Sequence, residues 1–485
     1  MDAGRTIPTL FDVVIPAEGA VETRRLLRAD LSDDDGIAKV GVAVNGEAPI
    51  DIAVEGTPKL LVVKEALPLV AGANRIVVTV TDGRGETSSK EVTFRYGLLT
   101  AAGGSHSGVI AKDALYTFGR NNVGQLGIGS DEPSKSAPEK IATATTPAAI
   151  AFNQNGSAFI DTAGGVWVWG ENRSNELGLG TGQGDRKNAP VANADAAGAT
   201  YLALGYGHML ALMKDGRVLG WGGNEVAQLG GDEVTHPVPT PIAGLPRDVV
   251  KIVGGSQHSA ALTASGDVWV WGRNEYGNLG AGTIDKDRHA TPAKVAALAD
   301  VVDIASGRDH LLAVSADGYV LSWGLGASGQ LGHGDPSGEG EFASPVATPT
   351  SVVTSDDGSS GLDGVATVYA NGNDSFALKR NGTLWGWGED GNGTLAQGGA
   401  GGPGAAPHKV GHAVRAGVYA VSTGTAEYLD ERVKLRSIAV GALHVVAMTS
   451  ANEVYTWGWS TNGTLGIPDF PAIWRQPTPA LVTVP

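Results

Sequence analysis

Cysteine is absent from this 485-residue chain, which excludes disulfide bonds, thiol catalysis and zinc sites built on cysteine. Long apolar runs are absent too. No stretch of about 20 apolar residues occurs, so no membrane-spanning helix is expected. Basic residues are scarce, since 35 lysines and arginines stand against 51 acidic residues and give a net charge of −16. Because no basic stripe or tail occurs, nucleic acid is not expected as a partner.

Glycine is abundant instead, with 72 residues, and most of it recurs around one phrase. An aromatic residue followed by glycine occurs seven times, with gaps of 51, 52, 50, 52, 64 and 70 residues. These aromatic residues are Phe118, Trp169, Trp221, Trp271, Trp323, Trp387 and Trp457. A fixed period of this length predicts one supersecondary unit repeated, with each copy burying its apolar face on the next.

The fourth copy shows the whole unit. Gly254–Ser259 leads into a strand of small residues, Ala260–Leu262, and a turn at Ser265–Asp267 leads into the strand Val268–Trp271. A glycine-rich loop then ends at Leu279, a single apolar anchor that we expect at the seam between neighbouring sheets. The equivalent leucines are Leu126, Leu177, Leu229, Leu331, Leu395 and Leu465.

The phrase resembles the repeat of the regulator of chromosome condensation family, and the resemblance covers residues 98–485. It implies an all-β chain in which residues 98–485 form a seven-bladed β-propeller. Comparison of the copies adds a hypothesis about ring closure. Pro479–Val484 matches a strand of a complete unit, and we expect it to supply the missing strand of the blade that begins near Tyr96.

One repeat position is histidine in five copies, while copies two and six have Asn155 and Asp374 there. The histidines are His106, His208, His258, His310 and His444. Five histidines around a propeller axis could bind a metal. We favour a structural role, in which each imidazole bridges backbone groups inside its own blade, because repeated polar residues usually satisfy buried backbone. No metal or other cofactor is expected.

Residues 1–97 lack the phrase and are expected to form a separate β-sandwich of short strands. Ile76–Thr81 alternates apolar and mixed positions, a hairpin turn follows, and Glu91–Phe94 is the expected return strand. Together with Leu67–Val78 and Ser32–Ile37, these positions resemble bacterial immunoglobulin-like and cadherin-like modules. The resemblance implies an export-associated spacer or adhesion module.

Three further features could indicate a function: an aspartate turn, a glycine-rich pattern and the tryptophans. A structural explanation is favoured for each of them. Asp33–Asp35 could hold calcium through hard oxygen ligands, but a solvated turn is the favoured interpretation. Gly324–Gly329 fits a dinucleotide-binding pattern, but it falls in the loop of the repeat and no helix follows. Photoreception, known in a plant member of the resembling family, requires tryptophans before the motif histidines. The residues there are Ser105, Gly207, Gln257, Asp309 and Leu443. None of them is tryptophan, so photoreception is not expected.

The gaps of 64 and 70 residues break the period, and such loops are where a propeller distinguishes its partners. They contain Gly338–Gly364 and Gly398–Lys434, which belong to adjacent blades and could form one recognition surface. The candidate binding residues are Glu339, Glu341, Phe342, Asp356, Asp357, Tyr419, Glu427, Tyr428 and Arg432. The alternative is that both are neutral insertions, because long surface loops cost little stability.

We expect a non-enzymatic scaffold that binds a protein or another ligand, a glycan included. The immunoglobulin-like resemblance favours an exported or cell-surface bacterial protein. The first residues lack a signal-peptide pattern, so export implies a signal already removed, and a cytoplasmic location is the alternative. The family name implies a second function, guanine-nucleotide exchange on a Ran-like small GTPase, although the acidic charge weighs against it. A third is enzyme inhibition, because a bacterial propeller inhibitor of β-lactamase has similar repeats.

Overall fold

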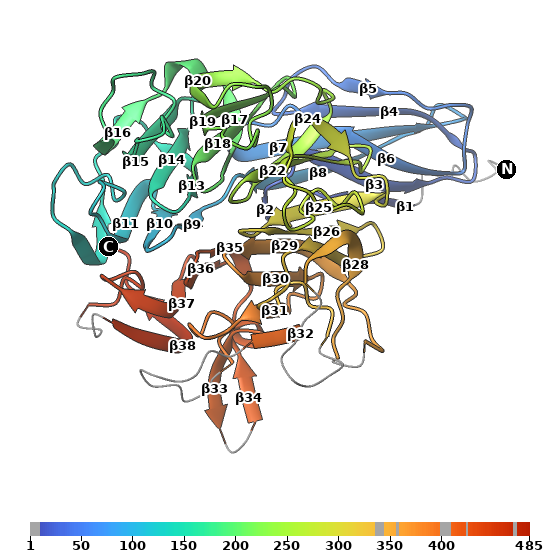
Figure 1. Cartoon of the computed structure of the whole chain (residues 1–485). Helices are drawn as coiled ribbons and strands as arrows, with labels where there is room; N and C mark the ends of the chain where they lie inside the picture. Colours follow the sequence, from blue (N-terminus) through green and yellow to red (C-terminus); the bar gives the residue numbers. More distant parts are fainter. Residues whose placement is uncertain (1–9, 335–343, 356–357, 398–408, 423–424, 469–472) are drawn as a thin grey trace.

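The computed structural model describes residues 10–334, 344–355, 358–397, 409–422, 425–468 and 473–485, and the chain is all-β (Figure 1). Seven sheets have four strands each, and every sheet takes four consecutive strands of the chain. We number them blade 1 to blade 7. The first strand of each blade contacts the first strand of the next, and that of blade 7 contacts that of blade 1. The repeats therefore close into the expected seven-bladed β-propeller.

The strands of blades 1 to 4 are β9 (Thr100–Ala102), β10 (His106–Ala111), β11 (Ala114–Arg120), β12 (Ser134–Lys140), β13 (Pro147–Phe152), β14 (Gly156–Asp161), β15 (Val166–Glu171), β16 (Arg186–Ala192), β17 (Ala199–Leu204), β18 (His208–Met213), β19 (Val218–Gly223), β20 (Thr235–Pro241), β21 (Val249–Gly254), β22 (His258–Thr263), β23 (Val268–Arg273) and β24 (Arg288–Lys294). Those of blades 5 to 7 are β25 (Val301–Ser306), β26 (His310–Ser315), β27 (Val320–Gly324), β28 (Val346–Ser351), β29 (Val365–Asn371), β30 (Asp374–Lys379), β31 (Leu384–Glu389), β32 (Lys409–Arg415), β35 (Leu435–Val440), β36 (His444–Thr449), β37 (Val454–Thr461) and β38 (Ile473–Val482). Between blades 6 and 7 lie β33 (Val418–Ser422), β34 (Thr425–Tyr428) and the short helix α1 (Leu429–Arg432), and a 3-10 turn, η1, spans Ala194–Ala196.

The glycine of the repeated phrase has a backbone conformation that side chains rarely allow. At all seven positions φ lies between 101° and 117°. The register between the third and fourth strands shifts at this point in every blade. In blade 4 a Cβ atom on Gly272 would lie 2.6 Å from the carbonyl oxygen of Gln257. The glycine thus allows both a β-bulge and a close backbone approach.

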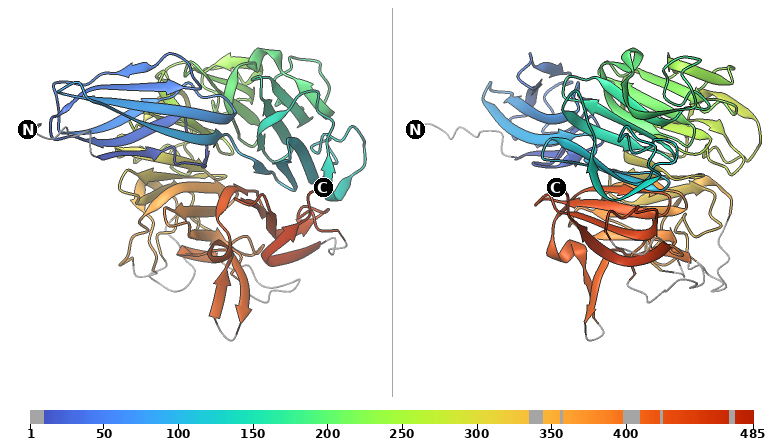
Figure 2. Two further views of the ribbon diagram at one scale, coloured as in Figure 1. Left: turned by 180° about the vertical axis from the view of Figure 1, so that it is seen from behind. Right: turned by 90° about the vertical axis from the view of Figure 1, so that its left-hand side faces the viewer.

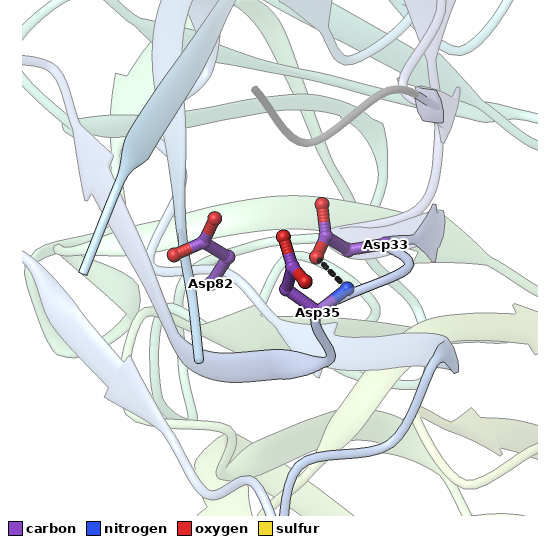
Figure 3. Close-up of side chains that lie close together, drawn as sticks. All are labelled: Asp33, Asp35 and Asp82. Atoms are coloured by element: carbon purple, nitrogen blue, oxygen red, sulfur yellow. Dashed lines mark hydrogen bonds between the residues drawn. The ribbon is translucent and has the colours of Figure 1, made fainter. Parts of the chain in front are cut away.

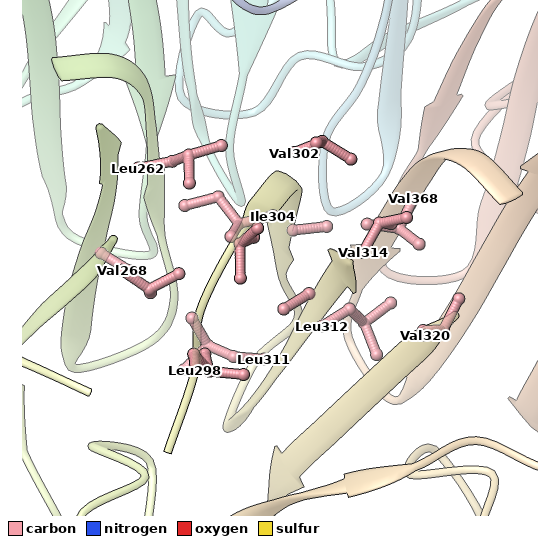
Figure 4. Close-up of a cluster of buried hydrophobic side chains, with 14 of the residues drawn as sticks. Leu262, Val268, Leu298, Val302, Ile304, Leu311, Leu312, Val314, Val320 and Val368 are labelled. Carbon is pink, nitrogen blue, oxygen red and sulfur yellow. The ribbon is translucent and has the colours of Figure 1, made fainter. Parts of the chain in front are cut away.

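Apolar side chains from neighbouring blades fill the seams. In Figure 4, Leu262 and Val268 of blade 4 face Ile304 and Leu312 of blade 5, and Val368 follows from blade 6. The seven anchor leucines, which have at most 5% exposure, lie in the same interior as expected. Burial of this kind stabilises by roughly 1.5–3 kcal/mol for each large apolar side chain.

Buried histidines add a polar link across five of the seven seams. Each imidazole Nε2 lies 2.7 to 3.0 Å from a serine Oγ of the next blade, in the pairs His106–Ser157, His208–Ser259, His258–Ser306, His310–Ser375 and His444–Ser107. Each serine donates its own hydrogen to a backbone carbonyl, so the imidazole is the donor in the pair. The expectation that each imidazole bonds inside its own blade is therefore wrong.

Asparagine replaces histidine at the other two seams. Asn153 of blade 2 donates to the Gly205 carbonyl at 2.7 Å, and Asn371 of blade 6 donates to the Val440 carbonyl at 2.9 Å. Each asparagine stands three residues before the histidine position, where the histidine-bearing blades have glycine. In those blades the imidazole fills this space, since a Cβ on Gly205 would lie 2.1 Å from the His208 ring.

The residues around the two asparagines change with them. Strand pairing puts Gly156, and not Asn155, at the histidine position of blade 2, while blade 6 has Asp374 there as expected. Where no histidine reaches across, the next blade has Met209 or Val445 in place of the usual serine. Burial raises the pKa of Asp374 well above its usual value. Glycine and histidine therefore change together, and serine is absent at both of these seams. The His258 seam also has no serine at this position, because Leu311 is there and Ser306 accepts the hydrogen bond instead.

The first and seventh blades meet without exchanging a strand. β38 pairs with β37, and β9 pairs with β10, so each of these blades is complete in itself. The expected closure by Pro479–Val484 is therefore wrong. The His444–Ser107 link closes the ring instead, together with a 2.8 Å bond between the hydroxyls of Thr100 and Ser437.

Residues 10–96 form two further sheets, which lie against one side of the propeller (Figure 2). One has the order β1 (Leu10–Ile15), β3 (Leu26–Ser32), β6 (Leu60–Ala66), and the other β2 (Val21–Glu22), β8 (Thr87–Tyr96), β7 (Gly72–Asp82), β4 (Ile37–Val44), β5 (Ile50–Ile52). Their apolar side chains join one cluster with residues of blades 3 and 4, such as Tyr201 and Trp271. The immunoglobulin-like resemblance of this region stays a prediction. No helix in the described part of the chain is long and apolar enough to cross a membrane.

Candidate functional site

The first strands of the seven blades enclose a central cavity of about 180 Å³. One repeat position, five residues before the histidine position, supplies a ring of lining residues. They are Ala101, Ala151, Ala203, Val253, Ala305, Tyr369 and Ala439. Six of the seven are small, so only Tyr369 places a large side chain at this level. The wall is apolar at this level, while polar residues such as Asn153, Lys251 and Asn371 line other parts of the cavity. Apolar surface with a few polar groups is usual for sites that take small molecules.

A segment of the N-terminal region covers one end of this cavity. Thr23 lines the cavity, and the neighbouring Arg24 is 6% exposed. The Arg24 guanidinium donates to the carbonyl of Val302 at 3.1 Å and to that of Ala366 at 3.3 Å, which bridges blades 5 and 6. It also forms an ion pair with Glu22 at 2.9 Å. This end of the channel is therefore occupied by protein.

A second buried ion pair lies beside Arg24. Lys251 of blade 4 and Asp303 of blade 5 are 2.6 Å apart, and their side chains are 6% and 0% exposed. Asp303 also accepts hydrogen bonds from the Thr367 hydroxyl and the Val368 amide of blade 6. Burial alone would raise the pKa of Asp303, but Lys251 and Arg24 outweigh it and lower the pKa. The carboxylate stays charged and joins three blades below the N-terminal cover.

The opposite mouth of the cavity carries polar residues, of which Arg308 is exposed and Tyr206, Ser256 and Asp309 are half-buried. The Arg308 guanidinium lies 5.9 Å from the centre of the Tyr206 ring and 3.3 Å from the Asp309 carboxylate. Ser256 donates a short hydrogen bond to Asp309. Burial raises the pKa of the Tyr206 hydroxyl, so it stays a neutral donor. An aromatic ring, a guanidinium and a carboxylate at one rim are suited to contact with a polar ligand or a protein.

The structure does not test the first candidate loop. Glu339, Glu341, Phe342, Asp356 and Asp357 all lie outside the described residues. Whether this loop and the second one form a single recognition surface therefore stays a prediction.

The second candidate loop contains a β-hairpin that projects from the propeller (Figure 1). β33 and β34 pair only with each other among the described strands. Tyr419 is on β33, Glu427 and Tyr428 are on β34, and Arg432 ends α1. Arg432 lies 2.6 Å from the Glu427 carboxylate. The structure therefore brings Glu427, Tyr428 and Arg432 together at the base of one hairpin.

The base of the hairpin is held firmly on blade 6. The Arg415 guanidinium of β32 lies 4.1 Å from the centre of the Tyr428 ring and 2.7 Å from the Asp430 carboxylate. Asp430 also accepts a 2.5 Å hydrogen bond from the amide of Leu384, and Leu429 is 2% exposed. A projecting ribbon thus has a rigid attachment, which lowers the entropy cost of presenting it to a partner.

Sequence reasoning missed the covered end of the cavity. Glu22, Arg24 and Arg25 belong to no repeat, and their partners belong to four different blades. The one available signal was the pair of adjacent arginines in an acidic chain. The ring of small lining residues, by contrast, could have been found by aligning the copies and comparing the residues five positions before the histidine position.

Comparisons with known proteins agree with this architecture. Residues 81–429 match the RCC1-like domain, and residues 435–464 match the regulator of chromosome condensation (RCC1) repeat. The chain is 29% identical over 398 residues to the ultraviolet-B receptor UVR8 of Arabidopsis thaliana, which covers 79% of this chain and 82% of the receptor. It is 33% identical over 284 residues to the probable E3 ubiquitin-protein ligase HERC6 of Homo sapiens, which covers 57% of this chain but 25% of the ligase.

Solved structures show the same fold. Human WBSCR16 has a TM-score of 0.63 and 21% identity, covering 77% of this chain and 95% of that one. Yeast RCC1 (Prp20), in its complex with Kap60, has a TM-score of 0.62 and 22% identity, covering 76% and 83%.

Proposed function

Because the chain belongs to the family of RCC1-like domains, we propose that it is a non-enzymatic scaffold that binds a protein through the β33–β34 hairpin. The observation that carries the proposal is a projecting two-stranded ribbon on a rigid base. Neither strand is hydrogen-bonded to a third strand in the described part of the chain, although β33 contacts β38. The outer edge of β34 is the one that an extended segment of a partner could join.

The names of the relatives support binding more than any single activity. They include a light receptor and a ubiquitin ligase, while the yeast structures concern Prp20 with Kap60 and its binding to Gsp1p and histones. These activities differ, and the propeller is what they share. Function on a shared fold is set by local surface features, and the aperiodic hairpin is such a feature here.

We further propose that the protein works at the cell surface or outside the cell. The support is the likeness of residues 1–97 to bacterial surface modules. Fractionation of the native source, with an antibody against this chain, measures the location. Recovery only from the cytoplasm would contradict this part of the proposal.

The binding proposal is tested by capture of partners on the full chain and on a variant with residues 419–427 replaced by Gly-Ser. The variant loses the Glu427–Arg432 ion pair but keeps Tyr428, Leu429 and Asp430, so the attachment to Arg415 stays in place. A matched control carries Leu60→Ser and Val62→Ser, which change exposed apolar residues on the edge strand β6.

We expect a partner that the full chain and the control retain and the shortened variant loses. Equal retention by all three would contradict the hairpin as the site. If the partner is a small GTPase, nucleotide release is measured next, because accelerated release would favour the exchange-factor alternative over a passive scaffold.

A further inference from the structure

Three aspartates meet at the end of the N-terminal sheets that lies away from the propeller. Asp33 and Asp35 belong to the turn after β3, and Asp82 is the last residue of β7. One ligand oxygen from each lies within 4.8 Å of the others, and Figure 3 shows the three carboxyl groups facing a common space. Gly72, at the other end of β7, lies next to Ala148 of blade 2. The eleven-residue strand therefore puts the cluster roughly 33 Å from that contact.

Asp82 is buried with one oxygen unused. Its residue is 1% exposed. The Oδ1 atom accepts hydrogen bonds from the amides of Arg84 at 2.9 Å and Glu86 at 2.8 Å, which fixes the turn. The Oδ2 atom has no hydrogen-bond partner among the described residues. A buried carboxylate oxygen without a partner is costly, so the native state has reason to supply one.

The other two carboxyl groups are also held in place. Asp33 is 4% exposed, and its Oδ1 accepts a hydrogen bond from the Asp35 amide at 2.8 Å. Asp35 is paired at 2.6 Å with the guanidinium of Arg84, whose side chain is 60% exposed. Three carboxylates and one guanidinium leave a local charge of −2, which a divalent cation neutralises.

Backbone contacts tie the two turns together. The Gly83 amide donates to the Gly36 carbonyl at 2.8 Å. A Cβ atom on Gly83 would lie 2.4 Å from the carbonyl oxygen of Asp35, so the close approach requires glycine. The carboxylates are thus fixed before any ion arrives, and binding needs little ordering of the chain.

We propose that Asp33, Asp35 and Asp82 bind a calcium ion, and that Arg84 occupies the Asp35 carboxylate when the ion is absent. Every donor is an oxygen, which selects a hard cation over zinc or copper. Calcium accepts irregular oxygen sets that include backbone carbonyls and water, whereas magnesium demands a near-ideal octahedron. The exposed Arg84 side chain can leave for solvent without opening the core.

Calcium titration of the full, chelator-treated chain by calorimetry tests the site. We expect one ion per chain, with a Kd on the order of 10⁻⁴ M, as in other modules with few charged ligands. Asp82→Asn and Asp33→Asn keep an Oδ1 acceptor for the turn amides while removing charge. Each should weaken binding at least about tenfold, a loss of about 1.4 kcal/mol. Asp51→Asn, at an exposed carboxylate of β5 that pairs with Lys39, is the matched control and should bind as the parent does.

An Arg84→Ala variant gives a result that misfolding cannot imitate. Removing the competing guanidinium should tighten calcium binding several-fold, whereas a damaged fold would weaken it. No heat of binding with the parent chain, binding unchanged by Asp82→Asn, or weaker binding by a folded Arg84→Ala variant would each overturn the proposal.

Discussion

The five seam histidines make a specific prediction about stability in mild acid. Burial lowers the pKa of His106, His208, His310 and His444 to about 3 and that of His258 to about 4. In the unfolded chain the pKa of each returns to about 6.5. The unfolded state therefore binds more protons between these values. The contribution of each neutral histidine to stability is complete above pH 6.5 and is lost as the pH falls towards the folded pKa.

The size of the effect at pH 5 does not depend on the exact folded values. At that pH each unfolded histidine gains about 2 kcal/mol from protonation, since one pKa unit is worth 1.36 kcal/mol. The folded histidines stay neutral. Five of them together should lower the free energy of unfolding by roughly 10 kcal/mol between pH 7.5 and pH 5. This is comparable to the whole stability of a typical domain.

The chain itself offers the control for this prediction. Replacing the set Gly205, His208 and Ser259 by Asn, Gly and Met copies the seam that Asn153 already makes between blades 2 and 3. The variant has one titrating seam fewer. Its loss of stability from pH 7.5 to pH 5 should therefore be smaller by about 2 kcal/mol.

Urea unfolding followed by tryptophan fluorescence measures both differences, because six of the seven blades carry a fully buried tryptophan. The comparison uses the change between the two pH values and not the absolute stability, so a small misfit of the new seam cancels. Equal acid sensitivity of the variant and the parent would show that the His208 imidazole takes up its proton as readily in the folded protein as in the unfolded chain, and the reasoning would fail.

Three further predictions follow from other contacts. Trp221→Phe should cost less than Trp271→Phe by about 1–3 kcal/mol in urea unfolding, because the Trp221 indole N–H has no partner among the described residues, whereas that of Trp271 donates to a carbonyl at 2.8 Å. Asp303→Ala should destabilise the protein by about 3–5 kcal/mol by leaving Lys251 buried and unpaired, and a change within error would contradict the pair's role. Deleting residues 476–485 should reduce amide protection in β37 and leave that of β12 unchanged, because the last strand belongs to blade 7. Loss of protection in β12 would instead support the hypothesis that the end of the chain completes blade 1.

The blade count and the buried anchors could be predicted because they depend on local signals. The phrase ending in Trp271-Gly272 requires a particular bulge, and the period of the phrase counts the copies. Leucines such as Leu279 are buried because the seam between neighbouring blades is the apolar environment within reach of a lone apolar residue in a glycine-rich loop. These features are decided inside one repeat, and each copy supports the assignment of the others.

The seams could not be predicted because they join different copies. His106 bonds to Ser157, 51 residues later, and no pattern within one repeat shows which serine faces which histidine. The sequence shows that Asn153 stands where other copies have glycine. It does not show that Asn153 donates a hydrogen bond to Gly205 of the next blade, which only the structure reveals.

The aspartate cluster and the hairpin show the same limit. Asp82 joins Asp33 and Asp35 only because two turns from different strands meet at one end of the sheets. The position of Glu427 and Tyr428 in an aperiodic loop was predictable, but their hairpin and its attachment to Arg415 depend on packing against blade 6.

The segment around Arg24 gives the propeller a floor. A propeller whose channel is open at both ends lets a small molecule pass through, whereas the channel of this one is closed at one end and forms a pocket. Any guest in the cavity must enter and leave past Tyr206 and Arg308. A macromolecule seated on that rim would act as a lid, and it would trap a guest already inside or keep a new one out.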